Sequence, residues 1–196
     1  MELKPELKEN LIKLEEIIGA RFNDLKLLQA AIVHRSYPNE HPEENFSSNE
    51  RLEFLGDAIL EFLTSEFLYN KFPDEQEGIL TIYRAALVKT DNLAGVAREL
   101  KLNEYILMSR GEFALGNSSN VSILADLFEA ILGAIYLDMG LEKCKVFLNK
   151  VVWFKIDEIV RENLHIDPKT KLQSESQLRL KITPSYEIIS EIGKDH

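Results

Sequence analysis

Three carboxylates lie on one face of a helix that the sequence predicts around residues 49–60. Glu50, Glu53 and Asp57 follow one another at i, i+3 and i+7, a spacing that brings side chains to the same side of a helix. Glu53 and Asp57 are like charges four residues apart, which destabilises a helix in water and more so when partly buried. Gly56 lies between them and costs about 1 kcal/mol relative to alanine. A sequence selected for stability alone avoids both features, so we expect a cation here.

A second apolar segment, residues 122–138, carries acids in a similar way. Asp126 and Glu129 are spaced i, i+3 within a run of large apolar residues, and Gly133 follows one turn later. Glycines on both helices allow their backbones to approach closely, so the two acid pairs can converge. The expected cluster contains four carboxylates, with Glu50 at its edge: Glu53, Asp57, Asp126 and Glu129. Oxygen-only ligation selects a hard cation, Mg²⁺ or Mn²⁺ as a substitute, and suits in-line attack on a phosphodiester.

Two other interpretations of these acids are open. An acid on a helix most often belongs to a solvated face, and the cluster would then have no function. A di-iron four-helix bundle is a rival metal site, but it requires two Glu-x-x-His motifs. The sequence offers one, Glu162 to His165.

Other polar residues are weaker candidates. His34 follows an apolar run and is expected to form structural hydrogen bonds. Glu77 reads as a turn residue. Arg84 and Lys89 share a predicted helix and could meet phosphate, although a solvated face is the default. Cys144 lies between two lysines and is expected to be a surface or half-buried thiol rather than a nucleophile.

The elements that must position these residues are all helical. The organising helix is expected over residues 49–71, capped by Ser47 or Ser48, with an apolar stripe at Leu52, Leu55, Ile59 and Phe62. Other helices are expected over 6–18, about 24–36, 79–100 and 122–138, the last capped by Ser122, and from 141 to about 162. Loops or turns are expected over 37–48 and 74–78, a short helix or turn over 103–109, and a mobile loop at 111–119.

The composition limits the class of protein. A chain of 196 residues with 45% hydrophobic residues can form one domain with a small appendage. The net charge of −10 argues against a protein that coats nucleic acid with positive charge. Cys144 is the single cysteine, so no intramolecular disulfide forms. Neither a signal peptide nor an apolar stretch long enough to span a membrane is evident, so we expect a cytoplasmic protein.

The composition changes near residue 164. Residues 164–196 carry five basic and five acidic residues, so the acidic excess lies entirely in the preceding part. A short helix is expected within 169–181 and a strand within 184–192. So short a segment cannot bury a stable core by itself, and we interpret it as the first part of a second domain.

These motifs together resemble the ribonuclease III family. Residues 49–60, NERLEFLGDAIL, are similar to the family signature, and residues 122–133, SILADLFEAILG, to its second acidic motif. Three shorter matches support the resemblance in the same order: His34-Arg35-Ser36, Glu77-Gly78 and RAALV at residues 84–88. The resemblance covers about residues 10–160.

The resemblance implies an all-helical endonuclease domain that forms a homodimer and cuts double-stranded RNA with Mg²⁺, without a small-molecule cofactor. It implies staggered products with 5′-phosphates, in RNA processing such as rRNA maturation. Motif matching makes Glu53, Asp57, Asp126 and Glu129 the metal ligands, with Asp57 and Glu129 essential for cleavage. It gives Glu50 and Glu77 supporting roles, and it places Phe54 in the dimer interface.

The end of the chain is similar to the opening of a double-stranded-RNA-binding domain, at DPKTKLQ (residues 167–173) and PSYE (184–187). The implied organisation is a nuclease domain over 1–163 followed by a linker and an incomplete RNA-binding domain over 164–196. Such a domain supplies much of the contact with duplex RNA, so affinity should suffer. Two alternatives remain: a non-catalytic RNA-binding or ribosome-associated scaffold of the same fold, and a compact member that works without an RNA-binding module.

Overall fold

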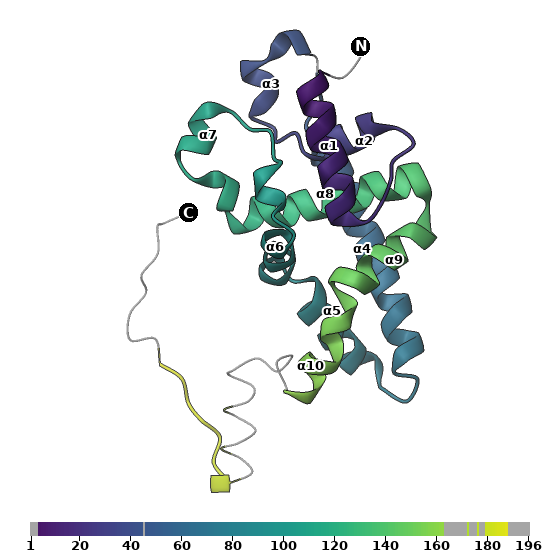
Figure 1. Cartoon of the computed structure of the whole chain (residues 1–196). Helices are drawn as coiled ribbons and strands as arrows, with labels where there is room; N and C mark the ends of the chain where they lie inside the picture. Colours follow the sequence, from purple (N-terminus) through teal and green to yellow (C-terminus); the bar gives the residue numbers. More distant parts are fainter. Residues whose placement is uncertain (1–3, 45, 163–171, 173–175, 177–178, 188–196) are drawn as a thin grey trace.

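A computed structural model describes residues 4–44, 46–162, 172, 176 and 179–187 (Figure 1). Its α-helices, in chain order, are α1 (Pro5–Ile18), α2 (Leu25–Ala31), α3 (Tyr37–Glu40), α4 (Glu50–Lys71), α5 (Glu77–Val88), α6 (Thr90–Glu99), α7 (Arg110–Ala114), α8 (Val121–Met139), α9 (Leu141–Val151) and α10 (Ile156–Arg161). Short 3₁₀ turns occupy Pro42–Glu44, Leu102–Glu104, Asn117–Ser119 and Trp153–Lys155. The described part is helical and contains no strand, which confirms the all-α prediction for the nuclease-like part of the chain.

Helix α8 is the centre of the core. It packs against α4, α6, α2 and α9, and every residue from Ala130 to Ile135 is buried (Figure 1). Helix α4 contacts α8 most extensively and buries a face that includes Leu52, Gly56 and Leu63. Because α8 is apolar on almost every side, any polar residue on it must be held at one end or in a pocket.

Several predicted boundaries are wrong. The helix expected over 79–100 is two helices that join at Lys89, where ψ is 145°. The second helix ends at Ala31 because the next residues run beside Leu107, to which the His34 amide donates a hydrogen bond of 2.8 Å. The last helix is interrupted at Val152 and continues as a 3₁₀ turn and α10. Residues 37–48 and 111–119, expected as loops, contain α3, α7 and two 3₁₀ turns.

The helix caps also differ from the prediction. Asn49 is the residue before α4, and Ser48 instead donates a hydrogen bond to Glu50 (Oγ–Oε2 2.7 Å). Asn120 caps α8, its side-chain oxygen accepting from the amides of Ser122 and Ile123. Both asparagines lie one or two residues from the serines that the sequence suggested.

The burial of two side chains differs from the prediction. Phe62 was assigned to the buried stripe of α4 but is 57% exposed. Cys144 was expected at or near the surface but is fully buried, and burial raises the pKa of its thiol to about 12. The thiol is therefore protonated and inert, which agrees with the expectation that it is no nucleophile.

Most of the predicted tail lies outside the described residues. The helix expected within 169–181 is described at too few positions to be traced, and residues 182–187 form neither helix nor strand. The rest of the expected strand, and the histidine of the Glu-x-x-His motif at 162–165, are likewise outside the described part. No helix of the described chain is both long and apolar enough to cross a membrane.

Candidate active site between helices α4 and α8

Two glycines bring the acidic helices into backbone contact. A Cβ atom added to Gly56 would lie 1.8 Å from the carbonyl oxygen of Glu129, and one added to Gly133 would lie 2.3 Å from that of Leu52. Each glycine on one helix therefore faces the backbone of the other. This confirms the predicted close approach, and it places the acids of α4 beside those of α8.

Three of the four predicted ligands converge across this contact. Glu53, Asp126 and Glu129 each offer a carboxylate oxygen, and these oxygens all lie within 4.8 Å of one another. All three side chains are half-buried. Asp57 is exposed and lies outside this set, but it is close enough to be the strongest charge acting on Glu129. Oxygen atoms at this spacing, with no nitrogen or sulfur among them, fit a hard divalent cation.

Burial and neighbouring negative charges raise the pKa values of the clustered carboxyl groups. Burial, reinforced by the charges of Asp57, Asp126 and Glu53, raises the pKa of Glu129 to about 8. Burial also raises the pKa of Glu53, with further contributions from its acidic neighbours, and it raises the pKa of Asp126. Without a bound cation Glu129 therefore retains a proton near neutral pH, and a cation would displace it.

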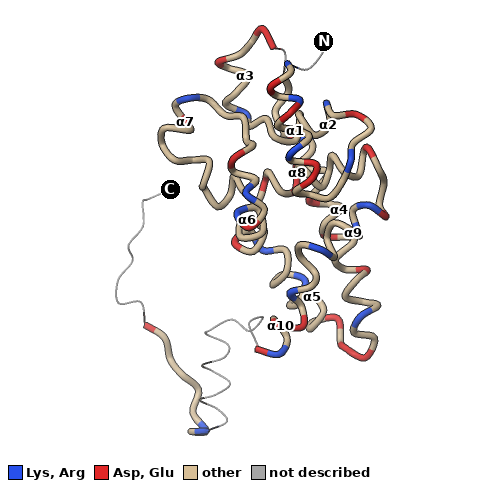
Figure 2. The backbone as a smooth tube through the Cα atoms, viewed as in Figure 1, with Lys and Arg blue, Asp and Glu red and all other residues tan. Residues whose placement is uncertain are grey.

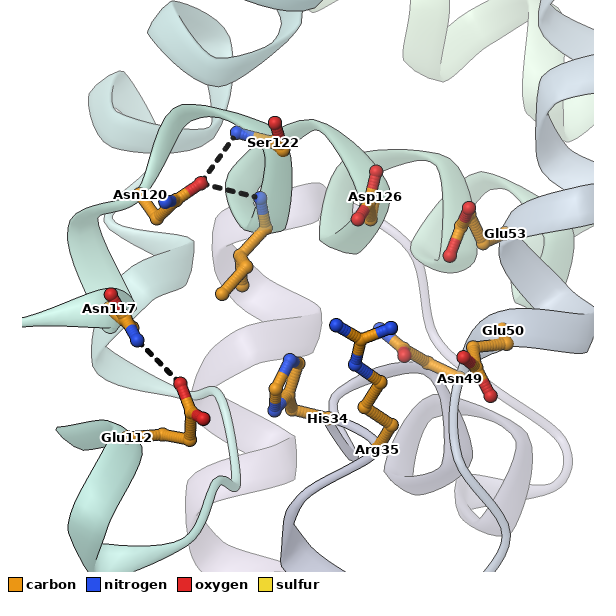
Figure 3. A pocket seen from close by; sticks show the side chains of 11 residues that line it. His34, Arg35, Asn49, Glu50, Glu53, Glu112, Asn117, Asn120, Ser122 and Asp126 are labelled. Atoms are coloured by element: carbon orange, nitrogen blue, oxygen red, sulfur yellow. Dashed lines mark hydrogen bonds between the residues drawn. The ribbon is translucent and has the colours of Figure 1, made fainter. Parts of the chain in front are cut away.

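A pocket of about 540 Å³ opens beside the cluster (Figure 3). Glu53 and Asp126 line it, together with Glu50. Other lining residues come from the segment around α7, where Asn117 donates a hydrogen bond to Glu112. The acids thus face a polar space large enough for part of a nucleotide chain.

His34 and Arg35 line the same pocket. His34 makes a structural hydrogen bond of the kind that the sequence predicted, between its ring Nδ1 and Ser36 Oγ (2.8 Å), and burial lowers the pKa of the imidazole. Arg35 belongs to the His34-Arg35-Ser36 match, but the sequence alone indicates no role for it. Its guanidinium nevertheless points toward the side of the pocket that carries Asp126 and Glu53 (Figure 3). The positive charge of Arg35 acts on both carboxyls and lowers the pKa of each against the larger effect of burial.

The remaining predicted residues lie elsewhere in the chain. Glu77 begins α5, accepts a hydrogen bond from Thr81, and lines a second, more apolar pocket of about 610 Å³. Arg84 lines that pocket too, but its guanidinium is engaged by Glu61 (Nε–Oε2 2.9 Å) and by Ser65. Lys89 lies at the break between α5 and α6 beside another pocket. The structure of one chain therefore brings none of these three to the acidic cluster.

Phe54 is 80% exposed on α4, between Glu53 and Asp57 in sequence. The family resemblance places this residue in a dimer interface, and in the single chain its side chain is free to make such a contact.

This chain is similar to known proteins over most of its length. A family model described as Ribonuclease-III-like matches residues 24–155. Ribonuclease 3 of Chloroflexus aurantiacus is 45% identical over 97% of this chain and 78% of its own length. Ribonuclease 3 of Enterococcus faecalis is 45% identical over 94% of this chain and 80% of its own length.

Solved structures are similar as well. One structure of the nuclease domain of ribonuclease III from Campylobacter jejuni, whose description refers to a region involved in dimer formation, has a TM-score of 0.66 and 41% identity. That match covers 71% of this chain and 93% of the Campylobacter chain. A structure of Dicer from Pichia stipitis has a TM-score of 0.52 at 26% identity, covering 89% of this chain and 77% of its own.

Proposed function

The chain belongs to the ribonuclease III family and is an endoribonuclease that acts on double-stranded RNA, and from this premise we propose which residues perform the reaction. Glu53, Asp57, Asp126 and Glu129 form the metal-binding site, and Asp57 and Glu129 are the acids whose loss abolishes cleavage. The observation that carries the proposal is the convergence of Glu53, Asp126 and Glu129, from two helices held in contact by glycines. A scaffold that only binds RNA has no need of this costly cluster.

We propose Mg²⁺ as the cation, with Mn²⁺ as a substitute. The donor set consists of carboxylate oxygens. Burial, together with the neighbouring acids, raises the pKa of Glu129, so the charged cluster is unfavourable without a counter-charge. Held by these carboxylates, a divalent cation would lower the pKa of a bound water and supply positive charge beside the phosphodiester. Glu129 and Asp126 hold their oxygens in place because α8 is fixed on most sides by the core.

Asp57 has a different environment from the other three acids. It is exposed, and its charge acts on the half-buried Glu129 of α8. An exposed carboxylate can change its side-chain conformation at low cost. We therefore assign Asp57 to the side of the site that meets the substrate, where it completes the ligand set when RNA and metal are present.

We further propose that the active form is a homodimer. Phe54, Phe62 and Tyr69 recur at i, i+8 and i+15 on α4 and are 80%, 57% and 72% exposed. They form one stripe on the face opposite the core, and such a stripe is unfavourable in a monomer. Phe62 and Tyr69 also line the apolar pocket of about 610 Å³, which can accept an aromatic ring. A second copy of the chain, with Phe54 entering this pocket, would cover both features.

A dimer of this kind would also explain Glu77. Glu77 lines the apolar pocket, whereas Glu53 and Asp126 line the other one. Phe54 is flanked in sequence by Glu53 and three residues later by Asp57. Its entry into the partner's pocket would carry these acids toward the partner's Glu77. The supporting role of Glu77 would then be exerted across the interface, while Glu50 supports the site of its own chain.

We also propose the division into a nuclease domain over 1–163 and a linker with an incomplete RNA-binding domain over 164–196. Helix α10 ends at Arg161, and the family match ends at residue 155, both inside the first unit. A cytoplasmic location stays a prediction.

The proposal is tested by incubating the protein with a perfect RNA duplex, its separated single strands and a DNA duplex of the same sequence, with Mg²⁺ and with EDTA. We expect cleavage of the RNA duplex alone, only with metal, into products with 5′-phosphates and staggered ends. Cleavage in EDTA, or binding of the duplex without cleavage at saturating Mg²⁺, would contradict it.

A further inference from the structure

The acidic pocket must admit a polyanion, and this raises a problem of charge. Glu50, Glu53 and Asp126 line the pocket, and the whole chain carries a net charge of −10. Figure 2 shows acidic and basic residues interspersed over the helices in this view, not a continuous basic stripe. Phosphate groups entering the pocket must therefore be met by individual cations placed at the site.

Arg35 is the one permanently charged cation among the residues that line this pocket. The other basic side chain there, His34, is partly buried, and burial lowers its pKa, so it is mostly neutral at pH 7. Arg35 is exposed, and in Figure 3 its guanidinium stands between His34 and Asn49, below Asp126. A phosphate that reaches the carboxylates from the pocket therefore passes this guanidinium.

The guanidinium of Arg35 is not used to hold the fold. Within the described residues it forms no hydrogen bond and no ion pair. Other arginines differ: Arg84 is bound by Glu61 and Ser65, and Arg98 donates to the carbonyl of Ser119 (3.2 Å). Arg35 lies close enough to Glu53 and Asp126 to affect both, yet it is not locked onto either. All five of its N–H donors are available to a ligand.

The backbone that carries Arg35 is fixed from several sides. Val33 pairs with Leu107, and its carbonyl accepts from the Asn49 amide (2.8 Å) at the start of α4. On the other side of Arg35, Ser36 Oγ accepts from the Ser109 amide (3.0 Å) and contacts the His34 ring. A side chain with free donors on an anchored backbone is suited to binding a ligand, because little ordering of the backbone is required.

We propose that Arg35 binds the phosphate group at the cut, through paired hydrogen bonds from its guanidinium to the non-bridging oxygens. The proposal rests on the function proposed above, because it places the reacting phosphodiester between Arg35 and the carboxylate cluster. The planar guanidinium presents two parallel donors to a phosphate, which a lysine ammonium cannot. Arg35 is thus a substrate-binding residue that also offsets the negative charge of the acids when RNA approaches.

The test compares three variants in cleavage of an RNA duplex with enzyme in excess. Arg35→Ala removes the cation, and Arg35→Lys keeps the positive charge but lacks the two parallel N–H donors of the guanidinium. Arg21→Ala is the control, because it removes an exposed arginine from the loop between α1 and α2. At saturating Mg²⁺ we expect the rate per unit of enzyme to fall about 10- to 100-fold in Arg35→Ala, the range for lost bonds to a charged group. Arg35→Lys should lie between, and Arg21→Ala should match the wild type.

Two further readouts separate phosphate binding from other roles. Loss of one phosphate contact should reduce the slope of log(kcat/KM) against log[salt] by about 1. The Mg²⁺ concentration for half-maximal rate should stay the same or fall, because no metal ligand is lost. Melting temperature and oligomeric state should not change, since Arg35 makes no contact that holds the fold.

The inference is overturned if Arg35→Ala cuts as fast as the wild type at saturating Mg²⁺ with an unchanged salt slope. It is also overturned if the variant differs only in needing less Mg²⁺, because Arg35 would then only offset the carboxylates. Failure of the wild-type protein itself to cut the RNA duplex would instead refute the proposed function.

Discussion

Replacing Gly56 with alanine should separate the two acidic helices. The new Cβ would lie 1.8 Å from the carbonyl oxygen and 2.6 Å from the carbonyl carbon of Glu129. Ordinary carbon contacts are about 3.5–4.0 Å, so α4 and α8 must move apart by roughly 1.5–2 Å. Both neighbours are backbone atoms, and no change of side-chain conformation can relieve the clash.

The expected loss of stability follows from two opposing effects. Overpacking of a core typically costs about 1–3 kcal/mol and occasionally more, and a clash with backbone belongs at the upper end. Alanine is a better helix former than glycine, and this difference offsets the loss of stability by about 1 kcal/mol. We therefore expect a net loss of about 2 kcal/mol, which lowers the melting temperature of a domain this size by roughly 4–8 °C.

The effect on cleavage should exceed the effect on folding. The carboxylates of Glu53 and Glu129 come from different helices, and a displacement of about 1 Å at a catalytic site can cost about 10²-fold in rate. Gly95 on α6 provides a matched control, because a Cβ there meets nothing within 4 Å. Gly95→Ala should be stabilised by about 0.5–1 kcal/mol and keep full activity.

Thermal melting and cleavage of an RNA duplex, measured at a temperature where both variants are folded, test this reasoning. If Gly56→Ala melts and cuts like the wild type while Gly95→Ala behaves as expected, the close contact of α4 and α8 does not position the site.

Further predictions concern the acid cluster, the dimer and the core. Without metal, folding raises the pKa of Glu129 from its ordinary 4.5 to about 8, so the folded protein binds the extra proton. Its stability should therefore fall as pH rises through that window, and Glu129→Gln should remove part of this fall in melting curves with EDTA. Phe54→Ala should shift the chain toward monomer in sedimentation velocity, whereas Phe113→Ala, another exposed phenylalanine, should not. Thr64→Val leaves the buried indole N–H of Trp153 without its acceptor at 3.1 Å, and denaturant unfolding should show a loss of about 1–3 kcal/mol.

Local sequence patterns predicted which acids share a helix face, because helix geometry alone determines that arrangement. The spacing of Glu53 and Asp57, and of Asp126 and Glu129, depends only on helix geometry, and the paired glycines indicated which helices would touch. The degree of burial of each acid could not be predicted from helix geometry. Asp57 is exposed while Glu129 is half-buried, because the wall around Glu129 comes from other parts of the fold.

Errors arose where distant segments override the local pattern. Phe62 and the buried Leu63 follow each other on α4, and both faces of that helix carry apolar residues, so periodicity could not choose the core face. The break at Lys89 has no glycine or proline to mark it. Arg35 lies in a turn that Leu107 and Asn49 hold from elsewhere in the chain, so no nearby residue indicated that it would reach the pocket.

The most direct test of the central claim is cleavage of a perfect RNA duplex with Mg²⁺ by the wild type and by Glu129→Gln, which keeps the side chain's size and removes its charge. If the carboxylates joined across α4 and α8 are the catalytic centre, the wild type cuts and the variant, equally folded and dimeric, does not. Cleavage by Glu129→Gln at the wild-type rate would contradict that assignment.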